Sequence, residues 1–119
     1  MPEPRPTIST HVLDTGRGTP AAGIRVRLWR RPANGGPTER LVGEAMTDAD
    51  GRIRDLLAGA PLETGQYRLE FDLEPTAGGS GVGGFFTGLS VGLRVDDPGR
   101  SYHVPLLRAP FGLSTYRGS

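Results

Sequence analysis

The chain has 119 residues, a length typical of one domain, and its formal net charge at pH 7 is +1. Because positive and negative charges nearly cancel, the charge does not favour a nucleic acid or an anionic membrane as partner. All 14 basic residues are arginines and there is no cysteine. The composition therefore excludes lysine Schiff bases, disulfides, thiolate nucleophiles and zinc sites that contain cysteine.

Glycine and proline are abundant, with 19 and 11 copies. Clean alternating apolar runs between them indicate that they punctuate a turn-rich all-β domain. No apolar run approaches the roughly 18 to 20 residues needed to span a bilayer, and residues 1–6 lack the apolar core of a secretory signal. We therefore expect a cytoplasmic protein with a flexible leader at residues 1–6 and one domain at residues 7–119.

The first strand is predicted at residues 8–14, where apolar and polar side chains alternate. One face of this strand then carries Ser9, His11 and Leu13. Turn-forming residues follow, and strict alternation of apolar residues with arginines predicts the next strand at residues 24–29.

The middle of the chain contains one weakly patterned strand, at residues 40–46. The Asp- and Gly-rich stretch 47–52 predicts a tight turn that delivers Arg52 onto the following strand. Residues 58–65 have room for at most two helical turns, with Pro61 near their start.

Three further segments complete the pattern. Residues 67–73 are apolar at every odd position and predict a strand, and residues 89–95 alternate in the same way. Between them, residues 75–84 contain five glycines and predict a mobile loop. A hairpin turn is predicted at residues 96–99. The pattern as a whole predicts an all-β fold: a β-sandwich of seven to eight strands with one short helix.

The terminal segment, residues 101–119, is dense in side chains that carry chemistry. It contains one of only two histidines, two arginines, two tyrosines, several hydroxyls and the chain's own carboxylate. Most domains let their final residues fray, so such a mixture there is unusual.

Three motifs in this chain resemble those of the 5-hydroxyisourate hydrolases of the transthyretin-related family. They are a strand–turn–strand block at residues 9–23 containing His-Val-Leu-Asp, the turn Thr-Asp-Ala-Asp-Gly-Arg at 47–52, and Tyr-His-Val-Pro-Leu-Leu at 102–107 with a terminal Tyr-Arg-Gly-Ser at 116–119. The resemblance covers nearly the whole chain. It implies a transthyretin-like (prealbumin) sandwich that assembles as a homotetramer, a dimer of dimers with sites in a channel between subunits.

The resemblance also implies an activity and a set of site residues. The reaction is hydrolysis of 5-hydroxyisourate to 2-oxo-4-hydroxy-4-carboxy-5-ureidoimidazoline in urate degradation. The implied catalytic residues are His11, Arg52, His103 and Ser119, and the implied substrate-binding residues are Tyr116, Arg117 and Gly118. The chain departs from the family's usual residues at Thr87, Ser101 and Leu113.

The residue types themselves limit the chemistry. Two histidines cannot build a His-rich two-metal site within one subunit, and a covalent route would need an activated hydroxyl. Direct attack by a histidine-activated water remains, with arginine stabilising the developing anion and no metal or cofactor. We expect His103 to be the base and His11 to orient the water, while Arg52 polarises the substrate.

Two other functions fit a sandwich of this kind. A transthyretin-like carrier would bind a hydrophobic ligand in an apolar channel, without needing two histidines, an arginine and the terminal motif together. A purely structural sandwich would leave the same residues on its surface.

Overall fold

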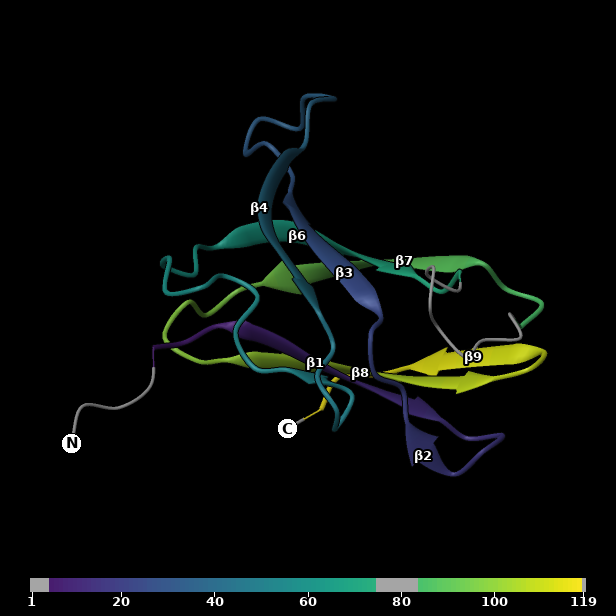
Figure 1. Cartoon of the computed structure of the whole chain (residues 1–119). Coiled ribbons are helices and arrows are strands. Elements are labelled where there is room, and N and C mark those ends of the chain that lie inside the picture. Colours follow the sequence, from purple (N-terminus) through teal and green to yellow (C-terminus); the bar gives the residue numbers. More distant parts are fainter. Residues whose placement is uncertain (1–4, 75–83, 119) are drawn as a thin grey trace.

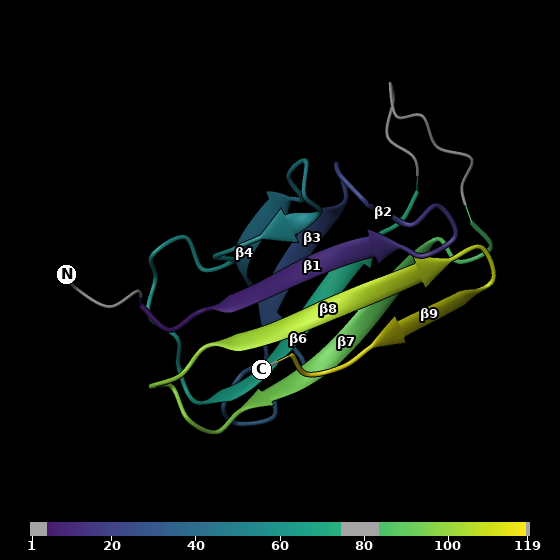
Figure 2. The same ribbon diagram turned by 90° about the horizontal axis from the view of Figure 1, so that it is seen from below.

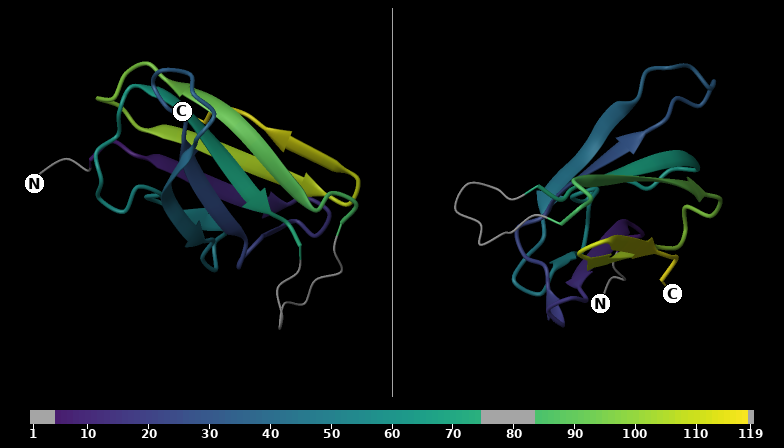
Figure 3. Two further views of the ribbon diagram at one scale, coloured as in Figure 1. Left: turned by 90° about the horizontal axis from the view of Figure 1, so that it is seen from above. Right: turned by 90° about the vertical axis from the view of Figure 1, so that its right-hand side faces the viewer.

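The computed structural model describes residues 5–74 and 84–118, and these form two stacked β-sheets (Figure 1). The first sheet has the order β2-β1-β8-β9, with β5 also paired to β1. The second sheet has the order β4-β3-β6-β7. Figure 3 shows the two sheets as separate layers of a sandwich. The predicted all-β fold is confirmed.

Five strands have bounds close to those predicted from sequence periodicity, at residues 8–14, 24–29, 40–46, 67–73 and 89–95. The first sheet comprises β1 (Ile8–Asp14), β2 (Thr19–Pro20), β5 (Arg52–Ile53), β8 (Tyr102–Ala109) and β9 (Gly112–Thr115). The second sheet comprises β3 (Arg25–Arg30), β4 (Arg40–Met46), β6 (Gly65–Asp72) and β7 (Gly88–Val95). All pairs are antiparallel except β1 with β8, which run parallel.

The core lies between the two sheets and follows the alternation of each strand. Side chains at every second position point inward and are buried, because a strand's successive side chains face opposite sides. The largest of these fully buried core side chains are Tyr67, Phe71, Ile8, Leu28 and Leu69. The other face of the first sheet is thereby left free for polar side chains.

The short helix predicted at residues 58–65 is absent, and this prediction was wrong. Ala58 and Gly59 both adopt positive φ angles, 49° and 88°, which a right-handed helix does not allow. The carboxylate of Asp55 accepts hydrogen bonds from the backbone N–H groups of Leu57 and Gly59 and folds the segment into turns instead. Pro61 supplies no N–H to continue a helix.

The turn at residues 96–99 is also not the predicted hairpin. It connects β7 of the second sheet to β8 of the first, so the two strands it joins do not pair. The hydroxyl of Tyr102 fixes this crossover by accepting a bond from the N–H of Asp97 and donating to its carbonyl, at 2.9 and 3.1 Å. An alternating pattern does not reveal which sheet a strand joins.

Some predictions fall outside the described residues. They are the first four residues of the expected leader, residues 75–83 of the expected glycine-rich loop, and Ser119. Within the described ranges there is no helix, and hence none long and apolar enough to cross a membrane.

Candidate active site

Strand pairing around β1 gathers the candidate catalytic residues from three distant parts of the chain. His11 of β1 lies opposite Arg52 of β5, and Ser9 of the same strand lies opposite His103 of β8. The alternate positions Thr10 and Val104 are buried on the inner face. His11, Arg52 and His103 therefore share the outer face of the first sheet, which faces the viewer in Figure 2.

A tight turn holds Arg52 in place beside β1. One carboxylate oxygen of Asp48 accepts hydrogen bonds from the backbone N–H groups of Asp50 and Arg52, both at 2.9 Å. The bond from Arg52 is the main reason why the pKa of Asp48 is lowered. Gly51 has a φ of 75°, and a Cβ there would lie 2.4 Å from the carbonyl oxygen of Val12. Only glycine lets the turn approach β1 this closely.

The same turn determines which ring nitrogen of His11 carries the hydrogen. Its Nε2 lies 2.8 Å from the backbone carbonyl oxygen of Asp50. Because a carbonyl can only accept, Nε2 carries the hydrogen and donates it. The neutral ring then has its lone pair on Nδ1.

His103 has the environment of a neutral imidazole. Burial lowers its pKa, and the positive charges of Arg52 and His11 lower it further. Its Nδ1 lies 2.8 Å from the Oγ of Ser9. At neutral pH this ring is unprotonated and can act as a base.

The terminal segment returns along β8 (Figure 2). It contacts His103 directly. Gly118 forms an isolated antiparallel bridge with His103, its N–H donating to the His103 carbonyl at 2.7 Å. This bridge continues the β8–β9 register, which puts Tyr116 opposite Pro105, itself the partner of His11. Tyr116 and Gly118 of the terminal motif are thus in register with residues on the face of the two histidines, whereas Arg117 is not.

Arg117 is held differently from its neighbours in the motif. Its guanidinium lies over the ring of the buried Tyr102, with Cζ 4.9 Å from the ring centroid. The tail is therefore fixed at two successive residues, by stacking at Arg117 and by the backbone bond at Gly118.

Two contacts of the site were not foreseen from the sequence. The hydroxyl of Ser9 and the carbonyl of Asp50 each hold one of the histidines. Alternation places Ser9 on the face of His11, which is a usable signal. The sequence contains no signal for the contact of the Asp50 carbonyl. Among residues 5–74 and 84–118, no group of three or more His, Asp or Glu side chains could hold a metal ion.

The chain is similar to known proteins over nearly its whole length. The HIUase/Transthyretin family matches residues 8–118. A 5-hydroxyisourate hydrolase of Caulobacter vibrioides is 42% identical over 116 residues, covering 94% of this chain and 97% of that protein. The structure of Klebsiella pneumoniae 5-hydroxyisourate hydrolase superposes with a TM-score of 0.78 at 35% identity, covering 96% of this chain and 99% of that one.

A hormone-binding relative is similar in fold. Sea bream transthyretin in complex with thyroxine gives a TM-score of 0.78 at 29% identity, with 93% of each chain covered. The match of the family over nearly the entire length, together with identities above 30% to full-length relatives, settles the assignment. The chain belongs to the HIUase/transthyretin family.

Proposed function

We propose that this protein hydrolyses 5-hydroxyisourate to 2-oxo-4-hydroxy-4-carboxy-5-ureidoimidazoline in urate degradation. The observation that carries the proposal is the convergence of His11, Arg52 and His103 on one sheet face, with the terminal segment bonded to His103. Relatives from bacteria and from mouse are named for this activity.

The reaction needs few groups. Ring opening is hydrolysis of a cyclic amide at an activated carbonyl, so one water must be positioned and deprotonated while negative charge develops on oxygen. His103 is the base, because its lowered pKa leaves it neutral. His11 orients the water. Arg52, always charged, binds the substrate and stabilises the developing oxyanion.

The terminal motif completes the proposed pocket. Tyr116, Arg117 and Gly118 bind the substrate's edge, and Ser119 takes part in catalysis, as the family motif implies. Tyr116 is 56% exposed and so accessible to a ligand on this face. The guanidinium of Arg117 stacks on Tyr102, a core residue on the inner face, so substrate binding by Arg117 requires its side chain to leave this position.

We further propose a homotetramer, a dimer of dimers. His11, Arg52 and His103 are each only partly buried on an open sheet face, so a second subunit packed across that face would close the pocket. Symmetry would give each site an equivalent partner. The cytoplasmic location expected from the sequence stays a prediction.

The experiment that tests the activity follows the ultraviolet absorbance of freshly made 5-hydroxyisourate, which decays spontaneously. The wild-type protein should accelerate the decay, and His103→Ala should lose a factor of about 10²–10⁴ in kcat/KM because general-base help is removed. Decay at the buffer rate with the wild-type protein would refute the proposed hydrolysis.

Similarity to transthyretin with bound thyroxine supports a second candidate, a carrier of a hydrophobic ligand. A carrier would bind such a ligand and leave the decay of 5-hydroxyisourate unchanged. The polar side chains gathered on the outer face favour the hydrolase.

A further inference from the structure

The imidazole of His103 is held along two of its edges by neighbours from opposite sides. Ser9 contacts Nδ1 from β1, and Gly118 lies against Cδ2 from the terminal segment. Ser9 is also the partner of His103 in the parallel β1–β8 pair, so the two side chains leave the sheet side by side. Ser9 makes its contact through a short side chain, and Gly118 makes its contact through the backbone.

The two contacts define the orientation of the ring. A Cβ at position 118 would lie 2.6 Å from Cδ2 of His103, so the backbone of Gly118 sits close against that edge. Turning the ring by half a turn would exchange Nδ1 with Cδ2 and leave Ser9 facing a carbon. The hydrogen bond to Ser9 therefore selects one orientation, in which Nε2 points away from β1.

Orientation and proton position are linked in a neutral imidazole. One ring nitrogen carries a hydrogen and the other a lone pair. The serine hydroxyl can accept a hydrogen from Nδ1 or donate its own to Nδ1, and Nε2 has no hydrogen-bond partner among residues 5–74 and 84–118. A base needs its lone pair on the nitrogen that is open to water.

We propose that Ser9 is a positioning residue whose Oγ accepts the hydrogen of His103 Nδ1 and thereby keeps the lone pair on Nε2. In the hydrolysis proposed above, on which this step rests, a water O–H bond breaks as its proton moves to Nε2. The hydroxide so formed then attacks the substrate carbonyl. Ser9 acts through the His103 ring and takes no part in these bond changes.

The test compares Ser9→Ala and an isosteric pair, Ser9→Thr and Ser9→Val, with the wild-type protein. Threonine keeps the hydroxyl, while valine keeps the shape without it, and both β-branched residues suit a strand. Ser101→Ala is the matched control. It removes a serine that also joins the starts of β1 and β8, through a bond from the N–H of Thr7.

Two readouts are needed. The first is the ¹⁵N spectrum of the ring nitrogens at a pH where both rings are neutral. The chain has only two histidines, so a His11→Gln variant assigns them. The second is turnover of 5-hydroxyisourate. We expect the Nδ1–H form of His103 to dominate in the wild type and the Nε2–H form to gain population in Ser9→Ala and Ser9→Val.

For turnover, we expect kcat to fall about 3- to 10-fold in the same two variants, with KM little changed, the loss expected for one hydrogen bond. Ser9→Thr and Ser101→Ala should match the wild type in both readouts. An unchanged tautomer balance in Ser9→Ala and Ser9→Val would overturn the proposal, and so would equal loss of kcat in the threonine and valine variants. A different result is possible, in which neither the wild type nor any variant turns over substrate but the tautomer balance of His103 still shifts in Ser9→Ala and Ser9→Val. In that case the proposed function fails, and the role of Ser9 in holding the ring stands.

Discussion

The surroundings of His103 decide the pH range in which the proposed site works. Burial is the main cause of its lowered pKa, and Arg52 and His11 add positive charge nearby. The ordinary histidine pKa is about 6.5. We therefore expect the midpoint of the acid decline in kcat/KM, where His103 takes up its proton, to lie below about pH 6.5.

Removing the charge of Arg52 should change the pKa of His103 in a known direction. Arg52→Gln should raise the pKa of His103, because the imidazolium no longer faces that guanidinium. The measurement is the titration midpoint of the His103 ring protons by NMR. Arg54→Gln removes the same charge from an exposed residue two positions along and should leave the midpoint unchanged. A midpoint that stays or falls in Arg52→Gln would contradict the electrostatic argument.

At the scale of single residues, the sequence was most informative where side chains form a motif. The motifs named His11, Arg52 and His103 as partners, and the strand pairing brings them onto one face. The contact between His11 and the Asp50 carbonyl could not be predicted from the sequence, because every residue has a carbonyl and only the turn geometry selects this one. Ser119 lies outside the described residues, so its role stays a prediction.

At the scale of elements, alternation located the strands but not their partners. Strand 8–14 was predicted with its observed bounds, yet its parallel pairing with β8 has no signature in either strand. The helix expected at 58–65 failed because local hydrogen bonds to Asp55 and two positive φ angles favour turns. Pairings between distant segments depend on the whole core rather than on either segment alone.

The terminal segment behaves as an element added to β8, and Gly118 is its closest point to the site. We expect Gly118→Ala to reduce kcat/KM at least 10-fold, because a Cβ 2.6 Å from His103 Cδ2 forces the segment or the imidazole to move. Thermal unfolding should change little, since both groups lie outside the core. Steady-state kinetics and the melting temperature of Gly118→Ala test both expectations.

Gly112→Ala is the matched control for this change. Gly112 lies in β9, and an added Cβ there meets no atom within 4 Å. Its kinetics should equal those of the wild type. Full activity in Gly118→Ala would mean that the packing of the tail on His103 does not matter for turnover.

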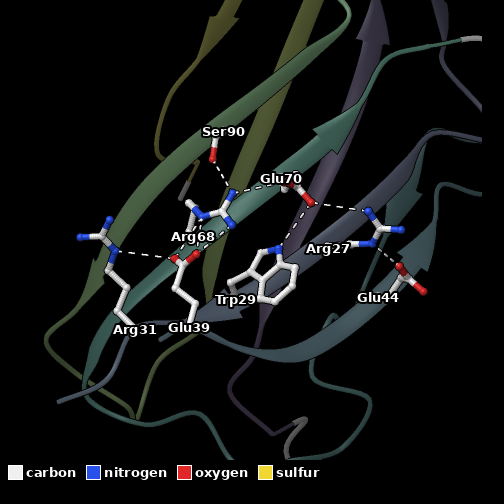
Figure 4. Close-up of polar contacts among 8 residues, drawn as sticks. All are labelled: Arg27, Trp29, Arg31, Glu39, Glu44, Arg68, Glu70 and Ser90. Atoms are coloured by element: carbon white, nitrogen blue, oxygen red, sulfur yellow. Dashed lines mark hydrogen bonds and ion pairs between the residues drawn. The ribbon is translucent and has the colours of Figure 1, made fainter. Parts of the chain in front are cut away.

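At the scale of the whole molecule, the two outer faces of the sandwich differ in character. The first sheet presents the candidate site. The second presents a network of ion pairs and hydrogen bonds that crosses all four of its strands (Figure 4). Arg68 is its centre: it binds Glu39 at 2.9 Å, reaches Glu70 and Ser90, and stacks over the ring of Trp29.

This separation predicts that stability and turnover can be changed independently. Arg68→Met keeps an apolar chain over Trp29 but removes the charge. We expect the free energy of unfolding to fall by about 1 kcal/mol, since partly exposed ion pairs and cation–π contacts are each worth about that much or less. Turnover should stay at the wild-type level, whereas His103→Ala should lose turnover and keep its stability.

Denaturant unfolding and steady-state kinetics on the same samples make the comparison. Arg94→Met on β7 is the control, because Arg94 is exposed and forms no ion pair within the described part of the chain. It should change neither quantity. High salt should shrink the difference between Arg68→Met and the wild type, because added ions screen exposed charges. If Arg68→Met loses turnover in proportion to stability, the two sheets are coupled and the site depends on the whole sandwich rather than on the first sheet.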